Sequence, residues 1–316
     1  MTLRDNILYI LEKQRGNYVS GQEIARVCGV SRSAVAKAIG LLKQEGFIIS
    51  SVKNLGHCLE NGCNALSEYG IKAYLPKEGI EVKVFDSIDS TNSEAKRAVS
   101  AGLNLDGIFV ADSQTAGRGR RGKDFYSPTG TGLYFTAVLH PEVSLTDATS
   151  ITSAAAVAVA KILEQETKKD PKIKWVNDIF IDNKKVCGIL TEAVSDLESN
   201  TVQAIIIGVG INLTTKEFPE DIKDIAAAAG KINRNRLSAR IFEELSRLCY
   251  ALPCKDFMED YRKYSLVTGK TVYFCKNGNN YSAIAKSITD NGELCVVTPE
   301  GEEMLLNSGE ISVKLF

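Results

Sequence analysis

Residues 117–123 read Gly117-Arg118-Gly119-Arg120-Arg121-Gly122-Lys123, three glycines interleaved with three arginines and followed by a lysine. Arginine and lysine are rarely fully buried, and glycines at this density cost more chain entropy than an ordinary turn requires. A bare backbone can approach a polyanion closely while guanidinium groups bind it through paired hydrogen bonds. We therefore predict a phosphate-binding loop, and the alternative is a solvated basic loop without function.

The same stretch satisfies two general phosphate-binding patterns, and its context argues against both. A dinucleotide-binding Gly-x-Gly-x-x-Gly follows a strand directly and opens a helix. Here residues 112–116 separate it from the predicted strand, and residues 125–132 contain Pro128 and two glycines. A P-loop needs Ser or Thr after its lysine, and this chain has Asp124. Neither a dehydrogenase nor a P-loop nucleotidase is favoured.

The bulk composition predicts an ordinary multidomain globular protein. The chain has 316 residues, of which 44% are hydrophobic and 24% charged, which suits two or three domains. It contains no apolar run of membrane-spanning length and no signal-peptide core, so we expect a cytoplasmic protein without membrane contact. The net charge is −1, but residues 1–65 hold eight Lys/Arg against five Asp/Glu, a net +3.

Cysteine and histidine usage argues against metal and nucleophile chemistry. Eight cysteines occur without a C-x2-C pair, and the only histidines are His57 and His140. We expect reduced thiols and no metal-ligating residues. So few histidines also weaken any Ser-His or Cys-His mechanism.

Hydrophobic periodicity predicts an α+β protein with several domains. Residues 1–62 read as a helical unit ending in a hairpin, 63–80 as a connector with a short helix at 65–74, 81–267 as a sheet with helices, and 268–316 as a small β-barrel. Sequential hairpins beside helices favour a mixed sheet over a doubly wound one. The strands are expected at 82–86, 108–112, 133–139, 173–181, 186–194, 202–208, 271–275, 281–288, 294–298 and 303–306, and the later helices at about 92–101, 147–167 and 238–264.

The N-terminal pattern indicates a helix-turn-helix. Ser20 to Glu23 form a capping box, Gly29 breaks the chain, and Ser31 caps a third helix. The exposed face of that helix is small and basic, which is typical of a recognition helix; the alternative is a three-helix packing module. Predicted phosphate contacts are Arg32, Lys37 and Lys53, and predicted base contacts are Ser33, Ala36 and Lys37.

Four further motifs differ from ordinary core sequence. Residues 89–92 (Asp-Ser-Thr-Asn) predict a helix N-cap whose exposed amides can rim a polar pocket. In residues 174–178 (Lys-Trp-Val-Asn-Asp) strand alternation places Ile173 and Trp175 on one face and Lys174 on the other. Residues 188–192 and 208–212 predict strands whose glycines interrupt apolar runs, as at a bulge or where a ligand approaches the backbone.

These motifs, in this order, resemble those of the biotin protein ligases, and the resemblance covers nearly the whole chain. Residues 117–123 match the family's adenylate-binding signature, and residues 174–178 resemble its Lys-Trp-Pro-Asn-Asp with Val176 in place of proline. Phe125 is a second departure, because the well-known bifunctional form has tryptophan there. Further matches are Ser90-Thr91-Asn92, Gln114, Gly188-Ile189-Leu190, Gly208-Val209-Gly210-Ile211-Asn212 and Gly309-Glu310-Ile311-Ser312.

The resemblance implies a class II synthetase-like central sheet, an SH3-like C-terminal barrel and a winged N-terminal helix-turn-helix, as in the bacterial form that also represses biotin genes. It implies that biotin attacks the α-phosphate of ATP, with Mg²⁺, to give biotinyl-5′-AMP. A lysine of a biotin carboxyl carrier protein, a subunit of acetyl-CoA carboxylase, then takes the biotin.

The resemblance also implies roles for individual residues. Lys174 and Arg118 are expected to be catalytic, with Lys174 bridging the biotin carboxylate and the α-phosphate that Arg118 and Arg120 hold. Expected biotin-binding residues are Ser90, Thr91, Asn92, Gln114, Gly117, Arg118, Gly119, Arg120, Lys174, Gly188, Leu190 and Gly208. Expected nucleotide-binding residues are Arg118, Arg120, Arg121, Phe125, Lys174, Trp175, Asn177, Asp178 and Asn212.

A single N-terminal domain of charge +3 offers few phosphate contacts, so operator binding is expected to need two copies. Biotinyl-AMP is expected to promote that homodimer. Two alternatives remain at this point: a lipoate-type ligase and a biotin-sensing repressor without ligase activity. The arginine-rich loop argues against the first, and the presence of Lys174 with the complete loop argues against the second.

Overall fold

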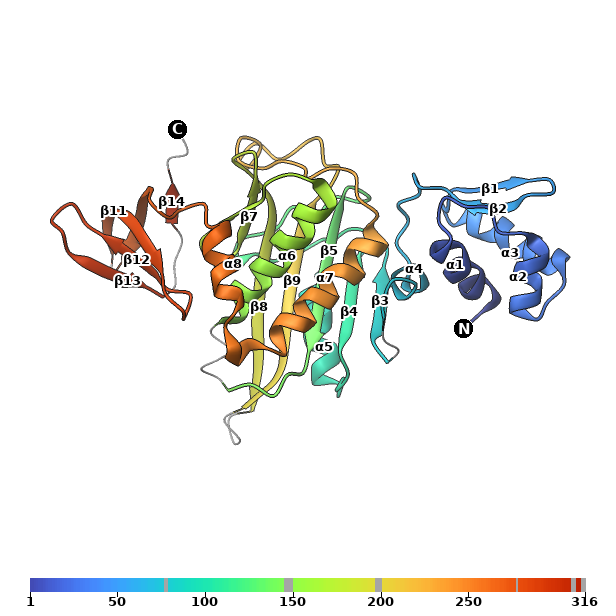
Figure 1. The fold of residues 1–316 in the computed structure, drawn as a ribbon, viewed down its shortest axis with the longest axis horizontal. Coiled ribbons are helices and arrows are strands. Elements are labelled where there is room, and N and C mark those ends of the chain that lie inside the picture. The colour runs from blue at the N-terminus through green and yellow to red at the C-terminus, as the bar shows by residue number, and fades with distance from the viewer. Residues whose placement is uncertain (77–78, 145–149, 197–200, 277, 308–310, 314–316) are drawn as a thin grey trace.

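The computed structural model describes residues 1–76, 79–144, 150–196, 201–276, 278–307 and 311–313. Figure 1 shows three parts in a row: a helical N-terminal part, a central sheet with helices packed on it, and a small C-terminal sheet. The predicted mixture of α and β parts is therefore confirmed. No helix in the described part of the chain combines the length and apolar character needed to cross a membrane.

The N-terminal part has the predicted order of three helices and a hairpin. Its elements are α1 (Leu3–Lys13), α2 (Gly21–Cys28), α3 (Arg32–Gln44), β1 (Ile49–Val52) and β2 (Gly56–Leu59). Ser20 Oγ accepts from Glu23 N–H and Ser31 Oγ from Ala34 N–H, so both predicted caps are present. Gly29 ends α2 in the left-handed region at φ 66°. Ile7, Leu11, Ile24 and Val35 pack in a separate small core.

The central sheet has seven strands in the order β3-β4-β5-β9-β8-β7-β6, with a single parallel pair, β3 and β4. Its strands are β3 (Glu81–Phe85), β4 (Gly107–Ala111), β5 (Gly132–Leu139), β6 (Lys172–Lys174), β7 (Asp178–Ile181), β8 (Lys184–Asp196) and β9 (Thr201–Asn212). The accompanying helices are α4 (Glu68–Lys72), α5 (Thr91–Ser100), α6 (Ile151–Thr167), α7 (Arg234–Cys249) and α8 (Phe257–Tyr264).

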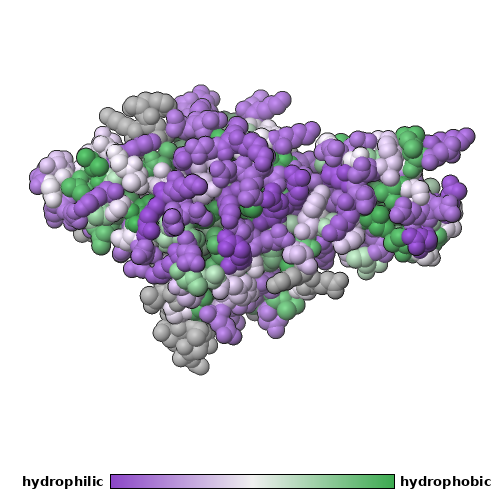
Figure 2. Space-filling view, in the orientation of Figure 1, coloured by the Kyte–Doolittle hydropathy of each residue, from purple (hydrophilic) through white to green (hydrophobic). Residues whose placement is uncertain are grey.

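The two faces of this sheet are covered unequally. One face packs against α6 and α7, which lie in front of the sheet in Figure 1, and forms the large apolar core. The outer surface of these helices is mostly hydrophilic in Figure 2. The opposite face has a smaller cluster, in which Ala95 and Val99 of α5 pack on Phe109, Val138 and Ile206. Helix α5 covers only one end of that face, which leaves the other end to polar residues and loops.

Several predicted elements are divided in the structure. The predicted strand 173–181 is wrong: the chain reverses at residues 175–177, where the Trp175–Val176 peptide is cis, and gives the antiparallel pair β6 and β7. The predicted helix 238–264 is two helices, separated by a 3₁₀ turn (Leu252–Cys254) that contains Pro253, because proline cannot continue a helix interior. The predicted helix at 65–74 is shortened to α4. The predicted start of α6 at residue 147 lies outside the described residues.

The C-terminal part is an antiparallel sheet in the order β13-β12-β11-β10-β14. Its strands are β10 (Thr271–Lys276), β11 (Asn279–Ile288), β12 (Leu294–Val297), β13 (Glu303–Leu306) and β14 (Ile311–Val313). Strand β14 was not predicted; of the motif 309–312, Gly309 and Glu310 lie outside the described residues and Ile311 is buried. Closure into an SH3-like barrel stays a prediction.

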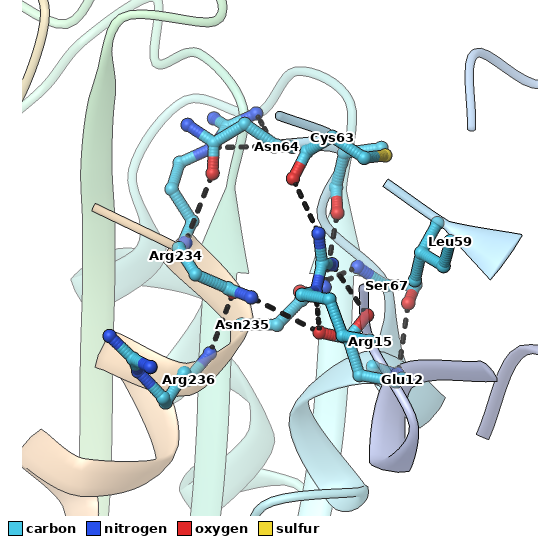
Figure 3. A network of polar contacts seen from close by, with 12 residues as sticks. Glu12, Arg15, Leu59, Cys63, Asn64, Ser67, Arg234, Asn235 and Arg236 are labelled. Atoms are coloured by element: carbon cyan, nitrogen blue, oxygen red, sulfur yellow. Dashed lines mark hydrogen bonds and ion pairs between the residues drawn. The ribbon is translucent and has the colours of Figure 1, made fainter. Parts of the chain in front are cut away.

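A buried polar network joins the N-terminal part to the central one (Figure 3). Glu12 of α1, only 1% exposed, forms a two-bond ion pair with Arg15 and also accepts hydrogen bonds from Tyr74 Oη and Asn233 Nδ2. Burial and the Glu12 charge raise the pKa of Tyr74 to about 12. Because these partners satisfy the buried carboxylate, the network fixes the end of α1 against the start of α7.

Arg234, the first residue of α7, extends this network. Its Nε and Nη2 donate to the Asn64 carbonyl at 3.0 and 2.7 Å, and its Nη1 donates to Asp112 Oδ1 at 2.6 Å and to the Gly132 carbonyl at 3.3 Å. Its side chain is 6% exposed. One guanidinium thus joins the connector, the end of β4 and the start of β5.

Candidate ligand-binding site

The strand register places several predicted site residues in one row on the sheet face that α6 and α7 leave uncovered. Cross-strand neighbours point to the same face. Tyr134 pairs with Gly210, Gly210 with Gly188, Gly188 with Asp178, and Asp178 with Lys174. The predicted orientation of Lys174 away from Ile173 is thus in agreement with the sheet. The neighbouring positions on this face are Asn212 on one side, and Thr136, Gly208 and Leu190 on the other.

The start of α5 forms one wall of the site. Ser90 caps the helix and is 2% exposed, and Thr91 and Asn92 are also buried. The Thr91 amide and hydroxyl both donate to Gln114 Oε1, at 2.9 and 3.1 Å. Two residues that are 23 positions apart in the sequence therefore lie side by side at the start of α5.

Beside this wall, Asp89 precedes the cap and pairs with Arg97 through two hydrogen bonds. The bonds from Arg97 lower the pKa of the Asp89 carboxyl to about 2. The pair lies at the surface, so its contribution to stability is small.

The glycine–arginine loop folds back on itself beside this wall. Gly119 N–H donates to the Lys123 carbonyl at 2.7 Å, and Phe125 N–H donates to the Gly117 carbonyl at 2.9 Å. A Cβ at Gly117 would lie 2.5 Å from the Phe125 carbonyl oxygen, so only glycine fits this crossing. Arg120 Nη1 donates to Asn177 Oδ1 at 3.0 Å, which joins the loop to the turn between β6 and β7.

Phe125 explains two of the strand glycines. A Cβ at Gly210 would lie 2.5 Å from the Phe125 ring, and a Cβ at Gly188 would lie 3.3 Å from it. The ring therefore rests on bare backbone, with its edge toward Tyr134 at a centroid distance of 6.5 Å. The sequence predicted that these glycines admit a close approach; here the approaching group includes an aromatic side chain of the protein itself.

Two lysines lie near this row, and the sequence analysis identified only one of them. The Lys174 ammonium is 5.8 Å from the centroid of the Phe180 ring. Lys185 Nζ is 2.8 Å from Asp178 Oδ1, and its Cε would contact a Cβ at Gly188 at 3.4 Å. Lys185 follows the turn between β7 and β8, in which Asp182 and Asn183 adopt positive φ. A lysine directly before a predicted site strand is the signal that could have indicated it.

Glu192 is a second missed residue. Its carboxylate accepts from Lys96 Nζ at 2.6 Å and from Asn92 Nδ2 at 3.1 Å, and lies 3.8 Å from Arg118 Nη2. Burial raises the pKa of this carboxyl, but the hydrogen bonds from Lys96 and Asn92 and the positive charges of Lys96 and Arg118 outweigh burial, so its pKa is lower than usual. The carboxylate therefore partly neutralises the positive charges of Lys96 and Arg118.

The structure does not bring Trp175 and Arg121 into this set. The Trp175 indole is buried in the core on the helix side, and its Nε1 donates to the Gly292 carbonyl of the C-terminal sheet at 2.9 Å. Arg121 is exposed at the tip of the loop, at φ 55°. Within the described ranges, no group of three or more His, Cys, Asp or Glu side chains is placed to hold a metal ion.

All five predicted DNA-contacting residues are exposed. Arg32, Ser33, Ala36 and Lys37 lie along one face of α3, while Val35 on its opposite face is buried. Lys53 is exposed in the turn between β1 and β2. The helix pair and its exposed face have the geometry of a helix-turn-helix.

The fold and the site together are those of a ligase-type domain joined to a helix-turn-helix domain. Comparison with known families agrees. Residues 84–212 match the biotin/lipoate A/B protein ligase family, residues 4–57 an HTH domain, and residues 267–314 the biotin protein ligase C terminal domain.

Individual relatives extend this match over most of the chain. The bifunctional ligase/repressor BirA of Bacillus subtilis is 32% identical over 317 residues, 95% of each chain. BirA of Escherichia coli is 28% identical over 235 residues, 73% of this chain and 72% of that one. The structure of biotin protein ligase from Aquifex aeolicus in complex with biotin and ATP superposes with a TM-score of 0.62 at 27% identity, covering 74% of this chain and 98% of that one. The chain belongs to the biotin protein ligase family, and the family predicted from the sequence is confirmed.

Proposed function

We propose that this member of the family joins biotin to ATP as biotinyl-5′-AMP, transfers the biotin to a lysine of a biotin carboxyl carrier protein, and represses biotin genes. Biotin ligation and repression follow from membership of the family with its N-terminal HTH domain. The observation that carries the ligase assignment is the row Lys174, Asp178, Gly188 and Gly210, with Phe125, which follows the glycine–arginine loop, packed on the two glycines.

The chemistry needs positively charged groups held in position, and it needs no nucleophile from this chain, because the attacking lysine belongs to the carrier protein. A biotin carboxylate oxygen forms a bond to the α-phosphorus while the bond to pyrophosphate breaks; a lysine amine then attacks the acyl carbon and AMP leaves. Negative charge grows on the phosphate, so catalysis consists of positioning and neutralisation. Arg118, Arg120 and Lys174 supply this charge, and Lys185 is a second candidate lysine because its ion pair with Asp178 borders the same row.

The remaining site residues are proposed to hold the two substrates. Ser90, Thr91, Asn92, Gln114, Gly117, Gly119, Leu190 and Gly208 would surround biotin, and Phe125, Asn177, Asp178 and Asn212 would contact the nucleotide. Arg121 would contact the nucleotide from the tip of the loop. Trp175 would act indirectly, because its side chain on the opposite face of the sheet fixes the turn that contains Asn177. Mg²⁺ takes most of its ligands from phosphate and water, so it would enter with ATP and need few ligands from the protein.

Biotin-dependent exchange of pyrophosphate into ATP tests this assignment, with lipoate and octanoate as competing acids. The matched family includes biotin and lipoate ligases, so lipoate has to be tested as a substrate. Exchange that depends on lipoate instead of biotin would establish a lipoate-type ligase. Comparing Lys174→Ala with Lys185→Ala identifies the phosphate-binding lysine, whose loss should slow exchange about a hundredfold or more. Retained exchange in both folded variants contradicts lysine neutralisation of the phosphate.

For the repressor half, we propose that α3 reads the major groove, that the β1–β2 hairpin is a wing carrying Lys53, and that biotinyl-AMP promotes the homodimer that binds a two-fold operator. Binding should tighten with biotin and ATP and weaken steeply with salt. Arg32→Ala with Lys37→Ala should abolish it. If the full-length protein at saturating biotinyl-AMP binds DNA from upstream of biotin genes no better than random DNA, the repressor assignment is wrong and the N-terminal part is a packing module.

A further inference from the structure

The turn at residues 175–177, between β6 and β7, is held from both faces of the central sheet. On the site face, Asn177 Nδ2 donates to the Ile189 carbonyl at 2.8 Å, and Ile189 N–H donates to the Asn177 carbonyl at 3.1 Å. On the helix face, Tyr261 Oη of α8 donates to the Val176 carbonyl at 3.1 Å. Tyr261 is fully buried in the large apolar core, so this bond reaches the turn from inside the protein.

The bond to β8 decides which atom of Asn177 faces the glycine–arginine loop. The Ile189 carbonyl only accepts hydrogen bonds, so Asn177 turns its NH₂ group toward β8 and its Oδ1 toward the loop. Arg120 Nη1 donates to that Oδ1 at 3.0 Å. The turn thus contacts one of the guanidinium groups that are proposed to neutralise the phosphate.

The Val176 carbonyl is a second acceptor in the neighbourhood of this guanidinium. Burial raises the pKa of Tyr261, and a hydrogen bond with Ser153 and the charge of Arg120 act in the opposite direction. The Arg120 charge therefore reaches the hydroxyl that is bonded to the Val176 carbonyl. A guanidinium has several N–H donors, so a Val176 carbonyl without its tyrosine partner would compete with Asn177 Oδ1 for Arg120, because an unpaired carbonyl at this depth is costly.

We propose that Tyr261 is a positioning residue for Arg120: by occupying the Val176 carbonyl, it holds the turn in place and leaves Arg120 paired with Asn177. The proposal rests on the proposed ligase function, in which Arg120 neutralises the negative charge that grows on the α-phosphate. A guanidinium displaced from that charge stabilises the transition state less, so the chemical step slows. The start of α5, which is proposed to bind biotin, belongs to the helix that packs on the other face of the sheet, so biotin affinity should not depend on Tyr261.

The test compares Tyr261→Phe with Tyr264→Phe in the full-length protein. Phenylalanine keeps the aromatic ring, so the packing of α8 is retained and only the hydroxyl is lost. Tyr264 is the matched control, because it lies on the same helix, is also buried, and its Oη donates to Glu164 Oε2 of α6 at 2.5 Å instead of to the turn. For Tyr261→Phe we expect kcat of biotin-dependent pyrophosphate exchange to fall about tenfold, and Kd for biotin, measured by calorimetry without ATP, to stay within about twofold. Tyr264→Phe should leave both values unchanged.

A double-mutant cycle separates positioning from a general structural role. In an Arg120→Ala background, Tyr261→Phe should lower kcat by less than about twofold, because the group that it positions is gone. A further loss as large as in the wild-type background overturns the proposal, and so does an unchanged kcat in Tyr261→Phe or an equal fall in biotin affinity. Wild-type protein without biotin-dependent exchange refutes the proposed function instead.

Discussion

Arg234→Met should destabilise the protein far more than the same change at its neighbour Arg236. Arg234 is 6% exposed on its side chain, and its loss leaves Asp112 and the carbonyls of Asn64 and Gly132 without their donor. Removing one partner of a buried pair costs about 3–5 kcal/mol. Asp112 is 25% exposed on its side chain, so water offsets part of this, and we expect about 3 kcal/mol.

Arg236 provides the control because it sits two positions further along α7 and pairs with Glu166 while its side chain is 47% exposed. Glu166 is 4% exposed, but it keeps its ion pair with Arg240 when Arg236 is replaced. We therefore expect the loss of the half-exposed Arg236 to cost about 0–1 kcal/mol. Urea unfolding followed through the chain's single tryptophan measures both variants, since Trp175 is 4% exposed in the central core. Free energies of unfolding within about 0.5 kcal/mol of each other would refute the reasoning that buried bonds to Arg234 hold the parts together.

Two further predictions concern the nucleotide side of the site and the N-terminal hairpin. Gly210→Ala places a Cβ 2.5 Å from the Phe125 ring, so it should displace the ring and weaken ATP binding several-fold, as measured by calorimetry. Gly62→Ala is the control, because its Cβ meets only the Lys231 ammonium at 3.8 Å, and its ATP affinity should not change. Equal ATP affinities of the two variants would contradict the role of the Phe125 contact. Burial and then the Lys43 charge lower the pKa of His57, so the folded state binds its proton less well than the unfolded state. The stability linked to His57 should be complete above about pH 6.5 and decrease as pH falls from there toward the lowered pKa. The wild-type minus His57→Gln difference in urea midpoint should follow this course, and a difference independent of pH would refute it.

The sequence predicted the sheet strands and the site motifs because each depends on local pattern. Ser20 and Ser31 cap helices through contacts three residues away, and the spacing of Gly208, Gly210 and Asn212 puts all three on one strand face. The break between β6 and β7 was missed although Asn177 and Asp178 are typical turn residues, because the apolar and β-branched residues on both sides of them favour a strand. The reversal there is held by distant groups: Tyr261 Oη donates to the Val176 carbonyl and Trp175 to Gly292.

The residues missed at the site share this dependence on distant partners. Glu192 matters through Asn92, 100 positions earlier, and Arg234 through Asp112, 122 positions earlier. A single charged residue at the end of a strand or the start of a helix looks in sequence like ordinary solvated surface. Only the assembled sheet shows that Glu192 and Arg234 are enclosed by polar partners. Trp175 lies with Ile173 on the helix side of the sheet, as strand alternation predicted, but its hydrogen bond to Gly292 of the C-terminal part is visible only in the assembled structure.

The polar network around Glu12 and Arg234 has a consequence for the spacing of the DNA half-sites that this protein can bind. The domain that contains α3 is joined to the catalytic part by buried hydrogen bonds from Asn233 to Glu12 and from Arg234 to Asn64. The direction of α3 is therefore set by the catalytic part. If such a repressor binds two half-sites as a dimer, the second recognition helix loses little orientational entropy when it binds its half-site, because its direction is already fixed. The dimer also tolerates little change in the spacer, since one added base pair rotates a half-site by about one tenth of a helical turn. Rotational phasing of the two half-sites would then act together with their base sequence in deciding which promoters such a protein can occupy.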